Sequence, residues 1–296
     1  MKKHSKIKAW VLSFRVKTLT ASVVPILVAT SLAWAEHSRL DYQVFVLTLL
    51  ASFFIQIGTN LFNDAIDFKK GADTEERIGP KRVTQGGYFT YKKVLFMAVF
   101  FLVMAFLCGV PLVIKGGWPF ILIGATSIFL AYGYTGGPFP LAYLGLGDLF
   151  VILYFGVISV MGVYYLHTGT LHWGIAVAGL QVGLLATVLL AVNNLRDFEQ
   201  DRKANKKTLV VRFGSSFGQF EILFLYSVAY ILNFYWLYKG FYGPLVLSLL
   251  SLPLAIYVVR FVYSTKPSPL YNSCLAKASA SHIAFGILFS AGILIG

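Results

Sequence analysis

The most regular feature of the chain is a series of long apolar runs separated by short polar segments. A helix needs about 20 apolar residues to cross ~30 Å of hydrocarbon, and most of the runs reach about that length. The pattern therefore predicts an all-α membrane protein with about nine transmembrane helices. The expected spans cover residues 18–35, 43–63, 94–114, 117–133, 146–166, 172–193, 219–238, 242–262 and 278–295.

Composition supports this architecture and limits the alternatives. Of 296 residues, 57% are hydrophobic and 12% are charged, which is too apolar for a soluble domain. No low-complexity segment or linker divides the chain, so residues 1–296 are expected to form a single integral-membrane domain. The two cysteines, Cys108 and Cys274, lie in or beside apolar runs and imply no disulfide framework.

The basic residues predict how the helices are oriented. With a cytoplasmic N-terminus, 22 of the 25 Lys and Arg fall on the cytoplasmic side, and only Arg39, Lys115 and Lys239 fall on the other. This asymmetry is typical of a multi-pass protein of the cell (inner) membrane. The net charge of +13 is therefore explained by topology and contact with anionic lipid, and no nucleic-acid partner is expected.

Two acidic clusters follow two of the apolar runs, and both are expected on the cytoplasmic side. Helical spacing would place each set of oxygen ligands on one face. Such ligands suit Mg²⁺, which usually completes its shell with water and substrate phosphates. The alternative is solvated loop charge, but ionisable groups at a membrane boundary are costly unless they are partnered. The first face holds Asn60, Asp64 and Asp67, and the second holds Asn193, Asp197 and Asp201.

Two further groups of residues lie near these clusters. Lys69, Lys81, Arg82 and Arg196 would bind a diphosphate, although the orientation bias alone also explains basic residues there. The glycines and prolines of residues 134–148 predict a tight loop, and a loop that closes over the site is the functional alternative.

These motifs together resemble the UbiA superfamily of intramembrane aromatic prenyltransferases. The first motif reads Asn63-Asp64-x-x-Asp67 with Asp73 following, and the second reads Asp197-x-x-x-Asp201. In the commoner form of the first superfamily motif, the third Asp falls where this chain has Gly71, and Asp73 takes its place. Further stretches resemble the branch that prenylates 1,4-dihydroxy-2-naphthoate in menaquinone biosynthesis. These further stretches are Arg15-Val-Lys17-Thr-Leu, Lys70-Gly-x-Asp73-Thr, Gly79-Pro-x-Arg82-x-x-Gln85, Tyr134-Thr-Gly-Gly-Pro, Gly145-Leu-Gly-Asp148, and the stretch from Asn193-Asn-Leu-Arg196-Asp197 to Thr208-Leu209.

The resemblance implies a helical bundle around a central cavity with two cytoplasmic Asp-motif loops. Asp64, Asp67 and Asp73 would hold one Mg²⁺ against the diphosphate of a polyprenyl donor, and Asp197 and Asp201 would hold a second. The acceptor, 1,4-dihydroxy-2-naphthoate, would lose CO₂ and give demethylmenaquinone.

Acceptor choice is expected to depend on residues at the same membrane face. Two alternatives to this function remain open. A 4-hydroxybenzoate or homogentisate acceptor is the alternative within the superfamily, and a secondary transporter is the alternative outside it. The acidic groups cluster at one face rather than at the midplane, which favours the enzyme. The expected acceptor-binding residues are Arg15, Lys17, Tyr134 and Asp148.

Overall fold

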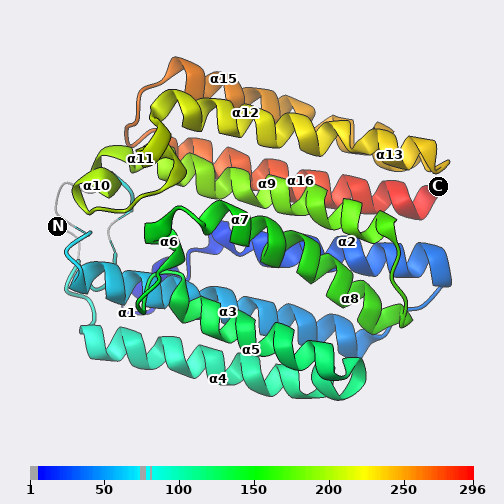
Figure 1. Ribbon diagram of the computed structural model, residues 1–296, viewed down its shortest axis with the longest axis horizontal. Coiled ribbons are helices and arrows are strands. Elements are labelled where there is room, and N and C mark those ends of the chain that lie inside the picture. The colour runs from blue at the N-terminus through cyan, green and yellow to red at the C-terminus, as the bar shows by residue number, and fades with distance from the viewer. Residues whose placement is uncertain (1–5, 74–77, 81) are drawn as a thin grey trace.

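The computed structural model describes residues 6–73, 78–80 and 82–296, apart from the side chain of Lys17. Within these residues every regular element is helical. Figure 1 shows long helices lying side by side along one axis, with α1 and the short helices α6, α10 and α11 near one end. The C-terminus lies at the opposite end (Figure 1). The prediction of an all-α membrane protein is confirmed.

The elements fall into long helices and short connecting ones. The long helices are α2 (Thr20–His37), α3 (Tyr42–Lys69), α4 (Tyr91–Gly116), α5 (Trp118–Gly133), α8 (Ile158–Thr168), α9 (Trp173–Arg196), α12 (Ser215–Ile231), α15 (Leu252–Ser264) and α16 (Tyr271–Ile295). The short ones are α1 (Lys6–Ser13), η1 (Val16–Thr18), α6 (Leu141–Leu144), α7 (Gly147–Ile152), η2 (Leu153–Val157), α10 (Phe198–Lys203), α11 (Leu209–Phe213), α13 (Asn233–Tyr238), α14 (Tyr242–Ser248) and η3 (Leu249–Ser251).

Seven helical segments of the described chain are long and apolar enough to cross a membrane, and α5 is a shorter apolar helix. Several of these segments join consecutive elements, as α7, η2 and α8 do over Gly147–Thr168. Each of the nine expected spans coincides with a helix or a joined series of helices. The chain is therefore a multi-pass membrane protein, and the count of nine transmembrane helices stays a prediction.

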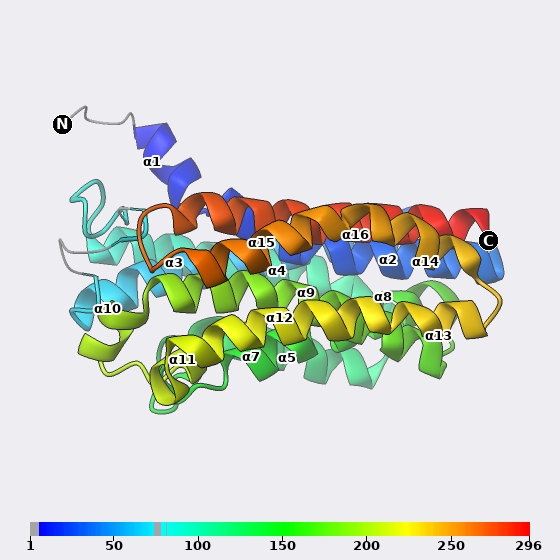
Figure 2. The same ribbon diagram turned by 90° about the horizontal axis from the view of Figure 1, so that it is seen from above.

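Helix α9 lies at the centre of the bundle (Figure 2). Of its most apolar stretch 78% is buried inside the protein, against 28% for α4. A helix that is buried on all sides needs an apolar surface all round, whereas a peripheral helix turns much of its surface to lipid. Helix α9 ends at the second acidic cluster, and Asp197, the residue that follows the helix, is buried as well (5% exposed).

The two acidic clusters differ in backbone structure. Helix α3 continues through the first cluster to Lys69, as the spacing predicts. The second cluster is not one unbroken helix, because α9 ends at Arg196 and Asp197 (φ −93°, ψ 9°) separates it from α10. Backbone bonds from Asp197 N to Asn193 O (3.0 Å) and from Asp201 N to Asp197 O (2.8 Å) preserve the helical spacing across this break.

A π-helical turn, η2, interrupts the span between α7 and α8. Gly156 in this turn packs directly on α9, where an added Cβ would lie 2.4 Å from Gly179 O and 2.5 Å from Gly183 Cα. Small residues allow such close backbone approach between membrane helices. The neighbouring side chains, Tyr154 and Phe155, line an internal cavity. The glycine contact therefore holds one wall of that cavity against the central helix.

Candidate active site

A cavity of about 280 Å³ opens among α2, α3, α5, α7, η2 and α9. Its lining changes character along its length. Acidic and amide side chains lie where α3 and α9 end. Most of the remaining lining surface is apolar or aromatic, with polar side chains such as Ser52, Gln56 and Thr59 among it. The polar group comprises Asn60, Asn63, Asp67, Asn193, Asn194, Asp197 and Asp201, and the apolar group includes Ile55, Leu130, Phe150, Val151, Tyr154, Phe155, Leu189 and Leu190.

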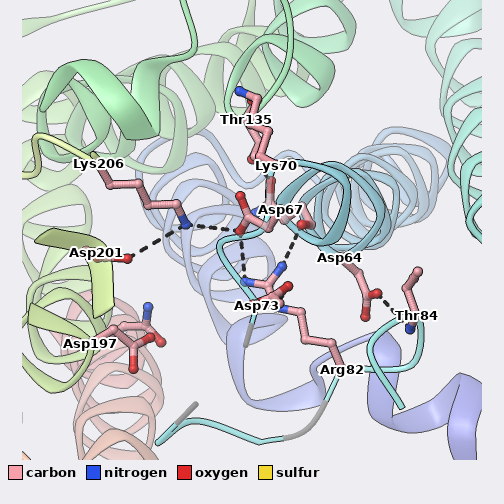
Figure 3. Close-up of polar contacts among 12 residues, drawn as sticks. Asp64, Asp67, Lys70, Asp73, Arg82, Thr84, Thr135, Asp197, Asp201 and Lys206 are labelled. Carbon is pink, nitrogen blue, oxygen red and sulfur yellow. Dashed lines mark hydrogen bonds and ion pairs between the residues drawn. The ribbon is translucent and has the colours of Figure 1, made fainter. Parts of the chain in front are cut away.

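Asp67 has partners on several sides in this cavity. It is 2% exposed, and it accepts a hydrogen bond of 2.9 Å from the Tyr143 hydroxyl. Its Oδ2 lies 3.1 Å from Arg82 Nη2 and 3.0 Å from Lys206 Nζ (Figure 3). A buried carboxylate needs partners that replace its lost hydration, and here two cations and a hydroxyl do so.

Arg82 joins the first acidic cluster to the segment that follows it. Besides Asp67, its guanidinium lies 3.2 Å from Asp73 Oδ2 and donates to Asn63 O at 2.6 Å. Burial alone would lower the pKa of Arg82, but the surrounding carboxylates, Asp67 first, raise it above its ordinary value. The guanidinium therefore stays charged, as its predicted role in binding an anion requires.

Asp64 faces a different partner from Asp67. Its carboxylate accepts the backbone N–H groups of Val83 and Thr84, both at 3.0 Å. Figure 3 shows Asp64 turned toward Thr84, away from Lys206. In this conformation Asp64 fixes the 82–84 segment beside the cavity, and its side chain is not part of the cavity lining.

The second acidic cluster is organised by Arg196, which is 2% exposed. Its guanidinium forms a two-pronged pair with the next residue, Asp197, at 2.7 and 2.6 Å. It also donates to Asn193 Oδ1 at 2.7 Å and to Asn272 Oδ1 at 2.9 Å. Paired, two-point binding of this kind is directional and strong. Arg196 therefore orients the side chains of Asp197 and Asn193, and through Asn272 it links them to the start of α16.

Three of the four predicted acceptor-binding residues come together at the same cavity. Arg15, Tyr134 and Asp148 all line it, from three different elements. Arg15 has a left-handed backbone (φ 53°), which is uncommon for a residue with a Cβ, and it follows the end of α1. Asp148 is 5% exposed, and its Oδ1 has no hydrogen-bond partner in the described residues. A buried carboxyl oxygen of this kind is available to a polar ligand.

The predicted diphosphate-binding residues are only partly brought together. Arg82 lines the cavity. Arg196 does not line it, but it binds Asp197, which does. The Lys69 ammonium lies 5.7 Å from the Tyr91 ring, and Lys69 is absent from the cavity lining. Lys81 lies outside the described residues, as does the Lys17 side chain.

Lys206 and Tyr143 contact Asp67 but were not among the predicted site residues. Lys206 belongs to a basic loop, where the orientation bias hides any individual role. Tyr143 occurs in a Gly- and Pro-rich stretch without any distinguishing pattern. Only the folded chain places both beside Asp67.

The donor set of the cavity fits magnesium held jointly with a phosphate group. Within the described residues, no three acidic, histidine or cysteine side chains are close enough together to bind a metal on their own. Mg²⁺ commonly uses one or two carboxylates and takes its other oxygens from water and substrate phosphates. Asp67, Asp197 and Asp201 line the cavity with amide oxygens nearby, which meets that requirement.

The fold and the cavity together define a multi-pass membrane protein with an acidic mouth on an apolar internal cavity. The sequence pattern of the UbiA prenyltransferase family matches residues 22–278. The chain therefore belongs to the UbiA prenyltransferase family, as the motifs suggested.

Named relatives resemble the chain over nearly its whole length. It is 36% identical to the 1,4-dihydroxy-2-naphthoate octaprenyltransferase of Haemophilus influenzae, covering 99% of this chain and 98% of that protein. It is 34% identical to the Escherichia coli protein of the same name, over 98% and 96% of the two chains. The structure of a UbiA homolog from Archaeoglobus fulgidus bound to GPP and Mg²⁺ superposes with a TM-score of 0.65 at 19% identity, covering 95% and 99%. This last likeness shows the common fold.

Proposed function

We propose that this chain transfers a polyprenyl group from a polyprenyl diphosphate to 1,4-dihydroxy-2-naphthoate with loss of CO₂, giving demethylmenaquinone. The observation that carries the proposal is a single cavity that joins an acidic mouth to an apolar, aromatic interior. A prenyl diphosphate has the matching division, with an anionic head and an apolar tail. Full-length similarity to the naphthoate prenyltransferases supports the choice of acceptor.

The acidic mouth is the proposed site of the diphosphate. Asp67, Asp197 and Asp201, with Asn60, Asn63 and Asn193, would hold Mg²⁺ against the diphosphate oxygens. Asp64 and Asp73 remain predicted ligands, although here they bind the 83–84 backbone and Arg82 respectively. Bound magnesium would neutralise charge on the departing diphosphate. Arg82, already beside Asp67, would add a fixed positive charge at the same place.

The apolar part of the cavity is the proposed site of the reacting carbons. The C–O bond of the donor breaks to give an allylic cation, and the diphosphate leaves with the bonding electrons. The rings of Tyr154 and Phe155 line the cavity and would stabilise that cation through their electron-rich faces. An electron-rich ring carbon of the acceptor then forms the new C–C bond. The bond between the ring and the carboxylate breaks, its electron pair restores the aromatic ring, and CO₂ leaves.

Arg15, Lys17, Tyr134 and Asp148 are the proposed acceptor contacts. A carboxylate on the acceptor matches the positive charge of Arg15 and Lys17. A ring hydroxyl matches the buried Asp148 oxygen. These polar groups would orient the acceptor beside the donor carbon, which accelerates a two-substrate reaction.

The mouth is proposed to face the cytoplasm. Helix α1 and the loops after α3 and α9 lie toward the same end of the bundle in Figure 1. In the sequence, residues 1–17, 64–93 and 196–218 together hold 19 of the 25 Lys and Arg. Single cysteines near Lys203 should therefore react with a membrane-impermeant reagent only in inverted vesicles. Labelling in intact cells would overturn this orientation.

A product analysis tests the proposed reaction directly. Purified protein receives Mg²⁺, labelled geranylgeranyl or longer diphosphate, and either 1,4-dihydroxy-2-naphthoate, 4-hydroxybenzoate or homogentisate. The expected result is one decarboxylated, prenylated naphthalenediol identified by its mass, with little product from the other acceptors. Efficient prenylation of 4-hydroxybenzoate with its carboxylate retained would contradict the acceptor assignment but not the prenyl transfer.

A further inference from the structure

One lysine stands between the two acidic clusters. Lys206 Nζ lies 3.0 Å from Asp67 Oδ2 in the first cluster and 3.8 Å from Asp201 Oδ1 in the second (Figure 3). Its side chain is 13% exposed. A single ammonium thus bridges carboxylates from α3 and α10, the two sides between which a divalent cation would be held.

Tyr143 supports this bridge from the short helix α6. Its hydroxyl donates to the other oxygen of Asp67, and its ring centre lies 5.2 Å from Lys206 Nζ. Burial and the adjacent Asp67 carboxylate raise the pKa of Tyr143, so the phenol keeps its proton and remains a donor. The ring provides a surface on which the lysine ammonium is favourably placed.

Hydrogen bonds from the backbone of Lys207 and the side chain of Arg212 also hold the segments of Lys206 and Tyr143 together. Lys207 N donates to Tyr143 O at 3.1 Å, and Arg212 donates to Leu144 O at 2.8 Å. Gly145 has a φ of +71°, and a Cβ there would lie 2.5 Å from Lys207 O. The base of Lys206 is therefore fixed, whereas its four-carbon side chain can still turn.

We propose that Lys206 is a built-in substitute for the divalent cation, pairing Asp67 with Asp201 until metal and diphosphate enter together. This inference rests on the proposed function. Before loading, the ammonium offsets the repulsion and lost hydration of the two carboxylates. On loading, it leaves Asp67 and Asp201 and binds a diphosphate oxygen.

This exchange makes the two ligands depend on each other. A divalent cation arriving alone must displace Lys206 without giving it a new anionic partner. When the diphosphate is present, the displaced ammonium gains one. Each ligand should therefore strengthen the binding of the other, and by the same factor. A lysine that only contacted the diphosphate would leave the affinity for metal alone unchanged.

Binding of Mn²⁺ to the purified protein, followed by electron paramagnetic resonance, tests this without any turnover. Mn²⁺ prefers the same oxygen ligands as Mg²⁺. Lys206→Gln should bind Mn²⁺ alone about three- to tenfold more tightly than the unaltered protein, since no charge-assisted bond must be broken. A non-cleavable prenyl thiodiphosphate should then enhance Mn²⁺ affinity about tenfold less in the variant than in the unaltered protein.

Lys70→Gln is the matched control. The Lys70 ammonium lies 4.1 Å from the same Tyr143 ring, but it donates to Thr135 O at 2.8 Å rather than to a carboxylate. The Lys70 charge acts on Asp67 without a direct bond, so its loss should raise the Mn²⁺ affinity clearly less than the loss of the Lys206 charge does. Lys206→Met, of similar length, replaces Lys206→Gln if the latter does not fold.

Two outcomes separate the inference from the proposed function. If the unaltered protein binds Mn²⁺ but the Lys206 variants bind it no more tightly than Lys70→Gln, the substitute role is wrong and the proposed reaction stands. If the unaltered protein binds no Mn²⁺ even with the thiodiphosphate, both are overturned.

Discussion

Arg82 Nη2 lies 3.1 Å from Asp67 Oδ2, and this pair joins the end of α3 to the segment that follows Pro80. Both side chains are almost fully buried, at 8% and 3% exposure. Such a pair does not add much net stability, because both ions lose their hydration. Loss of one partner, however, leaves the other charge buried, so the pair fixes the geometry of the site.

Replacement of Arg82 tests this relationship. Arg82→Gln leaves Asp67 with Lys206 and Tyr143 as its described partners and removes the cation beside Asp73, so we expect a loss of about 3 kcal/mol of unfolding free energy. Arg82→Lys keeps the charge without the planar fork and should recover part of that loss. Unfolding in mixed detergent micelles measures both variants. Equal stability of all three proteins would show that the pair has no structural role.

The carboxylates of the mouth should be essential for turnover. Asp67→Asn and Asp197→Asn each keep side-chain shape but remove charge needed beside the departing diphosphate, and we expect kcat/KM to fall at least about a hundredfold. Helix content by circular dichroism is the control for folding. Near-normal turnover of either variant at low Mg²⁺ would remove that residue from the proposed ligands.

Asp64 should have a second, measurable role in ordering the backbone. Its carboxylate accepts the N–H groups of Val83 and Thr84. In Asp64→Asn only one side-chain oxygen remains, so hydrogen exchange at these two amides should accelerate about tenfold. Asp73→Asn, which contacts Arg82 instead, should leave both amides protected. Unchanged exchange in Asp64→Asn would contradict the contact.

Much of the fold and part of this site were predictable from the sequence. The apolar runs identified the helices, because hydrocarbon thickness fixes their length. Asn60, Asp64 and Asp67 do lie on one helix, as their spacing predicted. The break at Asp197 was not predicted, since its neighbours favour a helix and the interruption occurs where buried Arg196 pairs with that residue.

The partners of each carboxylate were beyond the reach of sequence patterns. Spacing places Asp64 and Asp67 on similar faces, yet one binds backbone amides and the other binds Arg82 and Lys206. Residues far along the chain supply these partners, and nothing local to the motif encodes them. The π-helical turn η2 was likewise missed, because an extra residue in a helix leaves the apolar composition unchanged.

Close packing at that turn gives a prediction about stability. Gly156→Ala would place a Cβ against the backbone of α9 at Gly179 and Gly183, and we expect it to cost about 3 kcal/mol. Gly124→Ala in α5 is the matched control, because a Cβ there meets no atom within 4 Å. Its stability should be unchanged or slightly raised. Equal unfolding midpoints for the two variants would contradict the backbone contact.

Acceptor binding should depend on residues away from the acidic mouth. Asp148 lines the cavity with a buried oxygen that no described group satisfies, and a ring hydroxyl of the acceptor is its proposed partner. Lys17, in the adjoining η1 segment, is proposed to offset the acceptor carboxylate.

Asp148→Asn and Lys17→Ala should each raise the KM for 1,4-dihydroxy-2-naphthoate about tenfold and that for the prenyl diphosphate less than about twofold. A site built to bind a polar group discriminates strongly against a ligand that lacks it. Accordingly, naphthoate analogues lacking the carboxylate should react equally well with Lys17→Ala and the unaltered protein. Equal increases in both KM values would show instead that these residues shape the whole cavity rather than the acceptor site.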